Sequence, residues 1–243
     1  MKLSTLTSKL YIKFRIAENT EDLVEWALTE SNRSFVFPAF LERLTMLMPQ
    51  GKALGAKTEK RMKYVHGYHQ REQIRLQDQA STLVELLHSD TIYPDGSRIL
   101  EAGCGVGAQT VTLAGKNPGA AITSVDISAD SIAEAKEKIR EAGYTNVAFE
   151  QGDIFHLPFE PESFDHIFVC FVLEHLAKPI KALRSLKSFL KTGGTITVIE
   201  GDHGSAYFHP DNESARKTIQ CQVELQRRAG GNANIGRDRK SVV

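Results

Sequence analysis

The sequence predicts an open α/β fold in which helices cover both faces of a doubly wound, mostly parallel sheet. Three observations support this prediction. From about residue 62, short strand-like segments alternate with helical ones. Residues 165–172 form a near-continuous apolar run, which is typical of a strand covered on both faces. A glycine-rich segment, residues 103–107, stands where the first strand of the series turns into a helix.

Each expected element has a local signal. The strands are short, apolar or β-branched, and bounded by turn residues; they are expected at 98–102, 121–125, 147–151, 165–172 and 195–199. The helices have apolar residues at helical spacing; they are expected at 74–88, 106–115, 129–142, 179–191 and 212–229. Gly143 follows one helix, Pro179 stands in the first turn of the next, and Gly193 comes after the end of that helix.

Residues 1–61 carry a weaker pattern. Apolar residues at helical spacing predict helices near 20–28 and 35–48. We expect a helical extension outside the α/β domain, with a helical cap over the ligand site as the alternative. The α/β domain then covers residues 62–237.

The composition is that of an ordinary globular protein. The 243 residues include 30 Lys and Arg and 30 Asp and Glu, so the formal net charge is +0, which does not favour a general nucleic-acid binder. Three cysteines favour a reducing compartment over a disulfide framework, and we expect a cytoplasmic protein. The longest apolar run, residues 167–173, suits a buried strand and is too short to cross a membrane.

The strongest functional signal is the glycine loop, residues 103–107, together with three acids. Glu101 ends the first expected strand, and Asp126 ends the second, where it could accept hydrogen bonds from ribose hydroxyls or cap a helix. Asp153 ends the third, where it could accept from an adenine amine or form a turn. Glycines let a ligand approach the backbone, and a helix N-terminus favours an anion. The set predicts a site for a nucleoside-containing ligand at one rim of the sheet.

In these segments the sequence resembles the class I S-adenosylmethionine-dependent methyltransferases, in particular small-molecule enzymes of the quinone-biosynthesis type. The resemblance covers residues 62–237 and rests on motifs in the family's order: Glu101–Gly107, Asp126, Gly152–Ile154, Phe164–Ile167, Leu173–Leu176 and Leu190–Gly194. It implies that a methyl group moves from S-adenosylmethionine to a small-molecule acceptor by in-line displacement.

The resemblance also implies roles for single residues. The glycine loop would hold the methionine part of the cofactor, Asp126 the ribose, and Asp153 with Ile154 the adenine, while Glu101 organises the loop. Tyr64 and Tyr68 resemble a segment that covers the cofactor, although both could simply pack a leading helix. The implied cofactor-binding residues are Tyr64, Tyr68, Glu101, Ala102, Gly103, Cys104, Gly105, Gly107, Gln109, Asp126, Ile127, Asp153 and Ile154.

The acceptor side is less defined. His203, after the fifth expected strand, is the candidate general base because an imidazole exchanges a proton near neutral pH; alternatively, Asp202 and His203 only cap a turn. The spacing of Asp202, His203 and His209 matches no known metal-ligand signature, and we expect no metal. We find no Asn-Pro-Pro-Tyr or Pro-Cys pattern of macromolecule methylators. We therefore expect a small, partly apolar acceptor, with neither nucleic acid nor a membrane as partner.

Three other functions remain open. A dehydrogenase would need a third glycine one residue later, and an apolar residue where Glu101 stands. An aminopropyl transferase would usually carry more glycines and an Asp within the loop, in place of Cys104 and Val106. A module that binds the cofactor without catalysis is the third alternative.

The resemblance also suggests that the domain is incomplete. Its relatives have seven strands, whereas the pattern here predicts five. Residues 238–243 fit no element and match a translated sequencing adapter, so we expect a non-native tail. The strand at 195–199 would then be an unpaired edge of the sheet.

Overall fold

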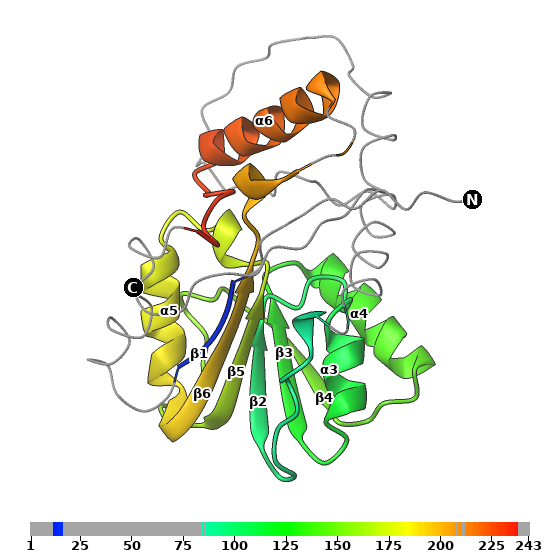
Figure 1. Ribbon diagram of the computed structural model, residues 1–243. Helices are drawn as coiled ribbons and strands as arrows, with labels where there is room; N and C mark the ends of the chain where they lie inside the picture. Colours follow the sequence, from blue (N-terminus) through cyan, green and yellow to red (C-terminus); the bar gives the residue numbers. More distant parts are fainter. Residues whose placement is uncertain (1–11, 17–83, 85, 208, 210–211, 238–243) are drawn as a thin grey trace.

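The computed structural model describes residues 12–16, 84, 86–207, 209 and 212–237. These residues contain a six-stranded sheet with the order β1-β6-β5-β2-β3-β4 (Figure 1). The strands are β1 (Ile12–Ile16), β2 (Arg98–Ala102), β3 (Ala121–Asp126), β4 (Val147–Gln151), β5 (Phe164–Cys170) and β6 (Leu190–Glu200). The five strands from β2 to β6 pair in parallel, as the sequence predicts.

The sixth strand corrects one expectation. β1 pairs antiparallel with β6, in a register that places Ile12 opposite Glu200 and Ile16 opposite Ile196. The prediction that the strand at 195–199 is an unpaired edge is therefore wrong. The backbone of β6 on this edge pairs with a segment more than 170 residues earlier in the chain. Local sequence patterns do not indicate such a long-range pairing.

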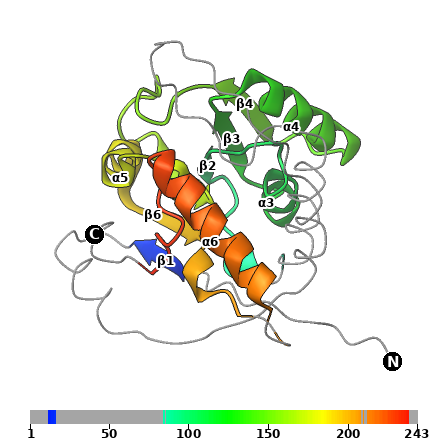
Figure 2. The same ribbon diagram turned by 90° about the horizontal axis from the view of Figure 1, so that it is seen from above.

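Helices lie on both faces of the sheet and over one of its ends. The α-helices are α3 (Thr110–Lys116), α4 (Ala129–Glu141), α5 (Pro179–Ser188) and α6 (Glu213–Arg228), and the 3₁₀ turns are η2 (Leu173–His175) and η3 (His203–Ser205). Figure 2 shows α3 and α4 on one side of the sheet and α5 on the other. α6 lies above the carboxyl ends of the strands.

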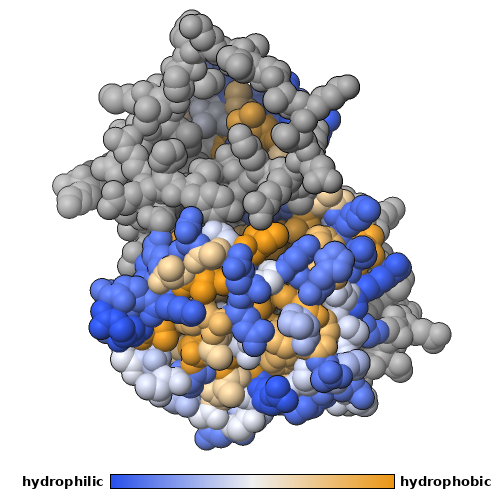
Figure 3. Space-filling view, turned by 180° about the vertical axis from the view of Figure 1, so that it is seen from behind, coloured by the Kyte–Doolittle hydropathy of each residue, from blue (hydrophilic) through white to orange (hydrophobic). Residues whose placement is uncertain are grey.

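Two apolar clusters fill the two faces, because successive strand residues point to opposite sides. On the α5 side, Leu100 of β2 packs in one cluster with Ala182 and Leu186 of α5. On the other side, Ile99 of β2 packs in a second cluster with Leu113 of α3 and Ile139 of α4. The space-filling view from behind shows hydrophobic residues bordered by hydrophilic ones on the described surface (Figure 3).

Three element boundaries differ from the sequence prediction. The helix expected from residue 106 begins at Thr110, because the preceding residues form turns after the glycine loop. β5 ends at Cys170, and Phe171 follows with a φ of 57°, which an extended strand does not allow. α5 ends at Ser188 and β6 begins at Leu190, earlier than the β-branched run at 195–199 suggests. The expected helices at 20–28 and 35–48, and nearly all of that at 74–88, lie outside the described residues.

Candidate functional site

The glycine loop follows β2 at the carboxyl end of the sheet. Gly103, Gly105 and Gly107 have φ values of 83°, 51° and 78°. A Cβ on Gly103 would lie 2.4 Å from Cγ2 of Val172, and one on Gly107 would lie 2.9 Å from Ala135 in α4. A Cβ on Gly105 would meet nothing within 4 Å. Packing thus requires glycine at the two ends of the loop, whereas Gly105 leaves open space next to the backbone.

Glu101, in the strand that precedes this loop, supports it through side-chain hydrogen bonds. Its side chain is buried, and Oε2 accepts hydrogen bonds from Thr110 Oγ1 at 2.8 Å and from Ser124 Oγ at 2.6 Å. Burial raises the pKa of this carboxyl from 4.5 to about 7, and the two hydrogen bonds oppose the rise. Ala102 is buried beside it, and burial also raises the pKa of the Cys104 thiol. Glu101 therefore ties β2 to β3 and to the start of α3.

Asp126 connects the loop to the next helix. Its Oδ2 accepts from the backbone N–H of Gly105 at 2.8 Å, and its Oδ1 accepts from that of Ser128 at 2.9 Å. Ser128, and not Asp126, caps α4, because its Oγ accepts from Ser131 N. Asp126 stays partly exposed and each oxygen keeps a further lone pair, while Ile127 beside it is 54% exposed. The carboxylate can therefore accept further hydrogen bonds from a ligand.

Asp153 lies one strand further along the same rim. Its Oδ1 accepts from Phe155 N at 3.0 Å, and its side chain is 42% exposed beside His156. Ile154 is partly buried against the α5-side cluster. We call this part of the rim, comprising Glu101, residues 103–107, Asp126 and Asp153, the glycine-loop side.

Three further residues predicted to bind the cofactor are Gln109, Tyr64 and Tyr68. The Gln109 side chain contacts His88, with Oε1 2.8 Å from the histidine Nε2, so it is already engaged within the protein. Tyr64 and Tyr68 lie outside the described residues.

A second group of acids lies where β5 and β6 end. Glu200, the last residue of β6, is buried, and its Oε1 accepts from the backbone N–H groups of Val172 and Leu173 at 2.9 and 2.7 Å. Its Oε2 lies 3.3 Å from Glu174 N. Burial raises the pKa of Glu200 to about 8, with the charge of Glu174 as the next cause. Glu200 therefore fixes η2 to the end of β6.

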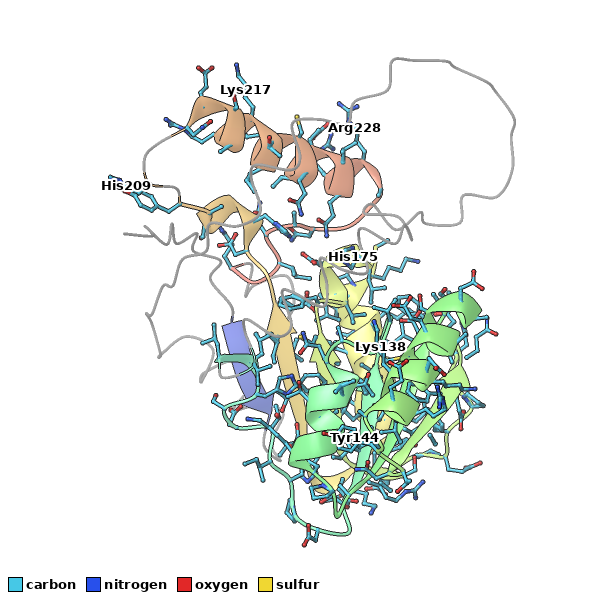
Figure 4. The ribbon with its side chains drawn as sticks, turned by 90° about the vertical axis from the view of Figure 1, so that its right-hand side faces the viewer. Lys138, Tyr144, His175, His209, Lys217 and Arg228 are labelled. Carbon is cyan, nitrogen blue, oxygen red and sulfur yellow. The ribbon has the colours of Figure 1, made fainter. Side chains whose placement is uncertain are left out.

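Glu174 reaches from η2 to two histidines. Its Oε2 lies 3.1 Å from His203 Nε2 in η3, and its Oε1 lies 3.4 Å from His175 Nε2. Figure 4 shows His175 between the sheet and α6, whereas His209 points away from the sheet. We call the part of the rim formed by η2, Glu200, η3 and α6 the α6 side.

His203 is placed at the rim but is not open to solvent. Its side chain is 3% exposed, and its Nδ1 is buried without a hydrogen-bond partner among the described residues. Asp202 is also buried; its Oδ2 accepts from Ser205 Oγ and from Arg237 Nε. The structure thus brings Asp202 and His203 to one turn without His209, which is exposed. Within the described part of the chain, no three His, Cys, Asp or Glu side chains form a group that could hold a metal ion.

Sequence reasoning singled out His203 but missed its partner. Glu174 stands in the Leu-Glu-His-Leu segment and Glu200 ends an expected strand, yet only the fold shows that both are buried, Glu200 against η2 and Glu174 against His203 of η3. The one available signal was the position of Glu200 at a strand end, which is where Glu101 and Asp126 also stand.

Comparisons with known proteins agree on one family. A family model described as "Methyltransferase domain" matches residues 94–231, more than half of the chain. An uncharacterized methyltransferase of Schizosaccharomyces pombe is 32% identical over 146 residues, which cover 58% of this chain and 52% of that protein. A demethylmenaquinone methyltransferase of Staphylococcus aureus is 33% identical over 106 residues, or 43% of each chain. The chain therefore spans about half the length of these curated relatives.

The fold also has a match among solved structures. A SAM-dependent methyltransferase from Aquifex aeolicus is 19% identical, with a TM-score of 0.50, and the match covers 68% of this chain and 89% of that one. This likeness supports the α/β architecture. Within the described residues, no helix is both long and apolar enough to span a membrane.

Proposed function

The chain belongs to the methyltransferase-domain family, and from this premise we propose that it transfers a methyl group from S-adenosylmethionine to a small-molecule acceptor. The observation that carries the proposal is the open space at Gly105, flanked by the partly exposed carboxylate of Asp126. A Cβ there would project into the space that a ligand needs. When bound, S-adenosylmethionine supplies an electrophilic methyl group on a sulfonium.

The residues of the glycine-loop side fit such a ligand. Open backbone at Gly105 can receive the methionine part, and the free lone pairs of Asp126 can accept from two ribose hydroxyls. The partly exposed Asp153 can accept from the adenine amine, with Ile127 and Ile154 against the ring. Glu101 positions the loop through its two hydroxyl partners, Thr110 and Ser124. We carry the full set predicted from the sequence into this proposal, including Tyr64, Tyr68 and Gln109.

We propose that the acceptor binds on the α6 side. The rim continues from the glycine loop to η2 and η3, where His203 is the candidate base for an acceptor that must lose a proton. The curated relatives include a demethylmenaquinone methyltransferase, which supports a small organic acceptor. We infer a cytoplasmic enzyme that acts on neither nucleic acid nor a membrane.

Two steps test this function. Calorimetric titration with S-adenosylmethionine, S-adenosylhomocysteine and NAD should show binding of the first two only. Release of S-adenosylhomocysteine should then be measured across a panel of phenols, quinols, amines and thiols. Cofactor binding without turnover on any acceptor would favour the non-catalytic module, and binding of NAD alone would overturn the proposal.

A further inference from the structure

The α6 side contains a buried acid–histidine pair that the cofactor site does not use. Glu174 and His203 come from η2 and η3, and their side chains are 7% and 3% exposed. Their facing atoms, Glu174 Oε2 and His203 Nε2, are 3.1 Å apart. Gln222 of α6 places its Nε2 3.4 Å from the same ring nitrogen, which is a weaker contact with an uncharged group. The carboxylate is therefore the dominant partner of Nε2.

Three polar contacts hold the backbone of Glu174 in place. Its N–H faces Glu200 Oε2, and its carbonyl oxygen accepts from Asn232 N and from Gln226 Nε2, both at 2.9 Å. A Cβ on Gly231 would lie 2.3 Å from that same carbonyl oxygen, so the returning chain packs directly on it. The Glu174 carboxylate is thus presented to His203 from a rigid support and not from a flexible loop.

The other ring nitrogen of His203 has no assigned partner. Nδ1 is buried and makes no hydrogen bond among the described residues. A buried polar atom left unpaired costs roughly 1–3 kcal/mol, so Nδ1 marks a position where a ligand or a water molecule can supply the missing group. When Nε2 carries its hydrogen toward Glu174, Nδ1 has a free lone pair and can only accept a proton.

We propose that Glu174 is a positioning residue, whose carboxylate accepts the Nε2–H of His203 and leaves Nδ1 to take a proton from a hydroxyl or amine acceptor. The proposal rests on the proposed function and narrows its substrate class to acceptors that carry a proton on the methylated atom. Acceptors without such a proton would have no use for Nδ1.

The proton and electron balance follows from this geometry. The acceptor's oxygen or nitrogen forms a bond to the methyl carbon, while the carbon–sulfur bond breaks and its electron pair stays on sulfur. The proton lost by the acceptor moves to His203 Nδ1, and the Glu174 carboxylate compensates the imidazolium charge. Release of that proton to solvent restores the neutral ring.

Other charged groups surround the pair. Glu200 and His175 both face Glu174, while Asp202 next to His203 is paired with Arg237. Glu200 shares the burial of Glu174, so removing the charge of Glu174 also makes it easier for Glu200 to ionise. The effect of Glu174 on His203 must therefore be measured on the histidine itself.

The experiment is ¹⁵N-histidine NMR of the full chain with bound S-adenosylhomocysteine. Two-bond proton–nitrogen spectra report the tautomer of each of the eight histidines, and His203→Gln identifies the signal of interest by its loss. We expect the Nε2–H tautomer of His203 in the wild type and a mixture of tautomers in Glu174→Gln, because a carboxylate can only accept the ring N–H, whereas an amide can also donate to the ring nitrogen. Glu213→Gln removes the same charge from an exposed site on α6 and should leave the His203 tautomer unchanged.

Two results overturn the positioning role: an Nδ1–H tautomer of His203 in the wild type, or a pure Nε2–H tautomer retained in Glu174→Gln. If Glu174→Gln does not fold, Glu174→Asp keeps the charge, and the wild-type tautomer alone still decides. With an acceptor from the panel, Glu174→Gln should lower kcat about 100-fold and leave KM within a few-fold. Wild-type turnover in His203→Gln would defeat this inference alone, whereas failure of the wild type to bind S-adenosylmethionine would defeat the proposed function, on which this inference rests.

Discussion

The glycine-loop side and the α6 side of the same rim hold their acids in different ways. On the glycine-loop side Glu101 is buried, but Asp126 and Asp153 are partly exposed and accept from backbone N–H groups, with lone pairs left over. On the α6 side both acids are buried: Glu200 accepts from the backbone of η2, and Glu174 contacts His203. The first arrangement suits a ligand whose hydroxyls and amines must be recognised from outside, and the second suits a proton held away from water.

The largest effect should follow from filling the open space in the loop. Gly105→Val places a branched side chain where nothing lies within 4 Å of the added Cβ, and we expect S-adenosylmethionine affinity to fall by more than about 100-fold. Gly143→Val is the matched control, because Gly143 also has a positive φ of 74° and an open Cβ position, but follows α4. Calorimetry should show loss of binding in the first variant only. Equal losses in both would mean that backbone strain, and not the filled loop, is responsible.

The next largest effect on cofactor affinity should come from Asp126, which we expect to recognise the ribose. Asp126→Ala removes the ribose acceptor and also two backbone partners, so we expect binding to weaken by roughly 1.5–3 kcal/mol, or about 10- to 150-fold. Asp130→Ala, an exposed acid in the first turn of α4, should bind as the wild type does. Thermal unfolding of both variants checks that they are folded. Unchanged affinity in folded Asp126→Ala would contradict the assignment.

Burial of Glu101 on the glycine-loop side and of Glu200 on the α6 side should make the free energy of unfolding fall as pH rises. The folded pKa values of Glu101 and Glu200 are raised to about 7 and about 8 from 4.5, so the folded state binds more protons than the unfolded state between pH 4.5 and 8. Their contribution is complete below about pH 4.5 and is lost as pH passes through 7 and 8. Each acid contributes at most about 1.4 kcal/mol per pH unit.

Urea unfolding of the wild type between pH 5 and 9 measures this dependence. Glu101→Gln should flatten the curve up to about pH 7, and Glu200→Gln should flatten it up to about pH 8. The pH up to which each variant flattens the stability curve therefore distinguishes Glu101 on the glycine-loop side from Glu200 on the α6 side. Stability that rises steadily over this range in all three proteins would show that neither acid is protonated in the fold.

The two sides also differ in how far the sequence could predict them. The loop, Asp126 and Asp153 follow consecutive strands, so strand order alone brings them to one rim, and the structure confirms that placement. The Glu174–His203 contact depends on where η3 returns, and the support of Glu174 comes from Gln226, 52 residues later. Strand existence could be predicted from β-branched runs, but the start of β6 at Leu190 could not, because pairing with β5 overrides the local glycine signal.

The smallest effect on binding should come from removing residues 1–61, of which Ile12–Ile16 join the edge of the sheet as β1. β1 pairs with β6 at one edge, whereas β2, β3 and β4 at the other side carry the glycine loop, Asp126 and Asp153, so cofactor affinity should stay within a few-fold. The same deletion exposes the backbone of β6, and an uncovered β-branched edge favours association between chains. Sedimentation velocity should therefore show a larger species in the deletion while calorimetry shows near-normal binding. Loss of cofactor binding in monomeric deleted protein would mean instead that residues 1–61 form part of the site, as expected for a helical cap.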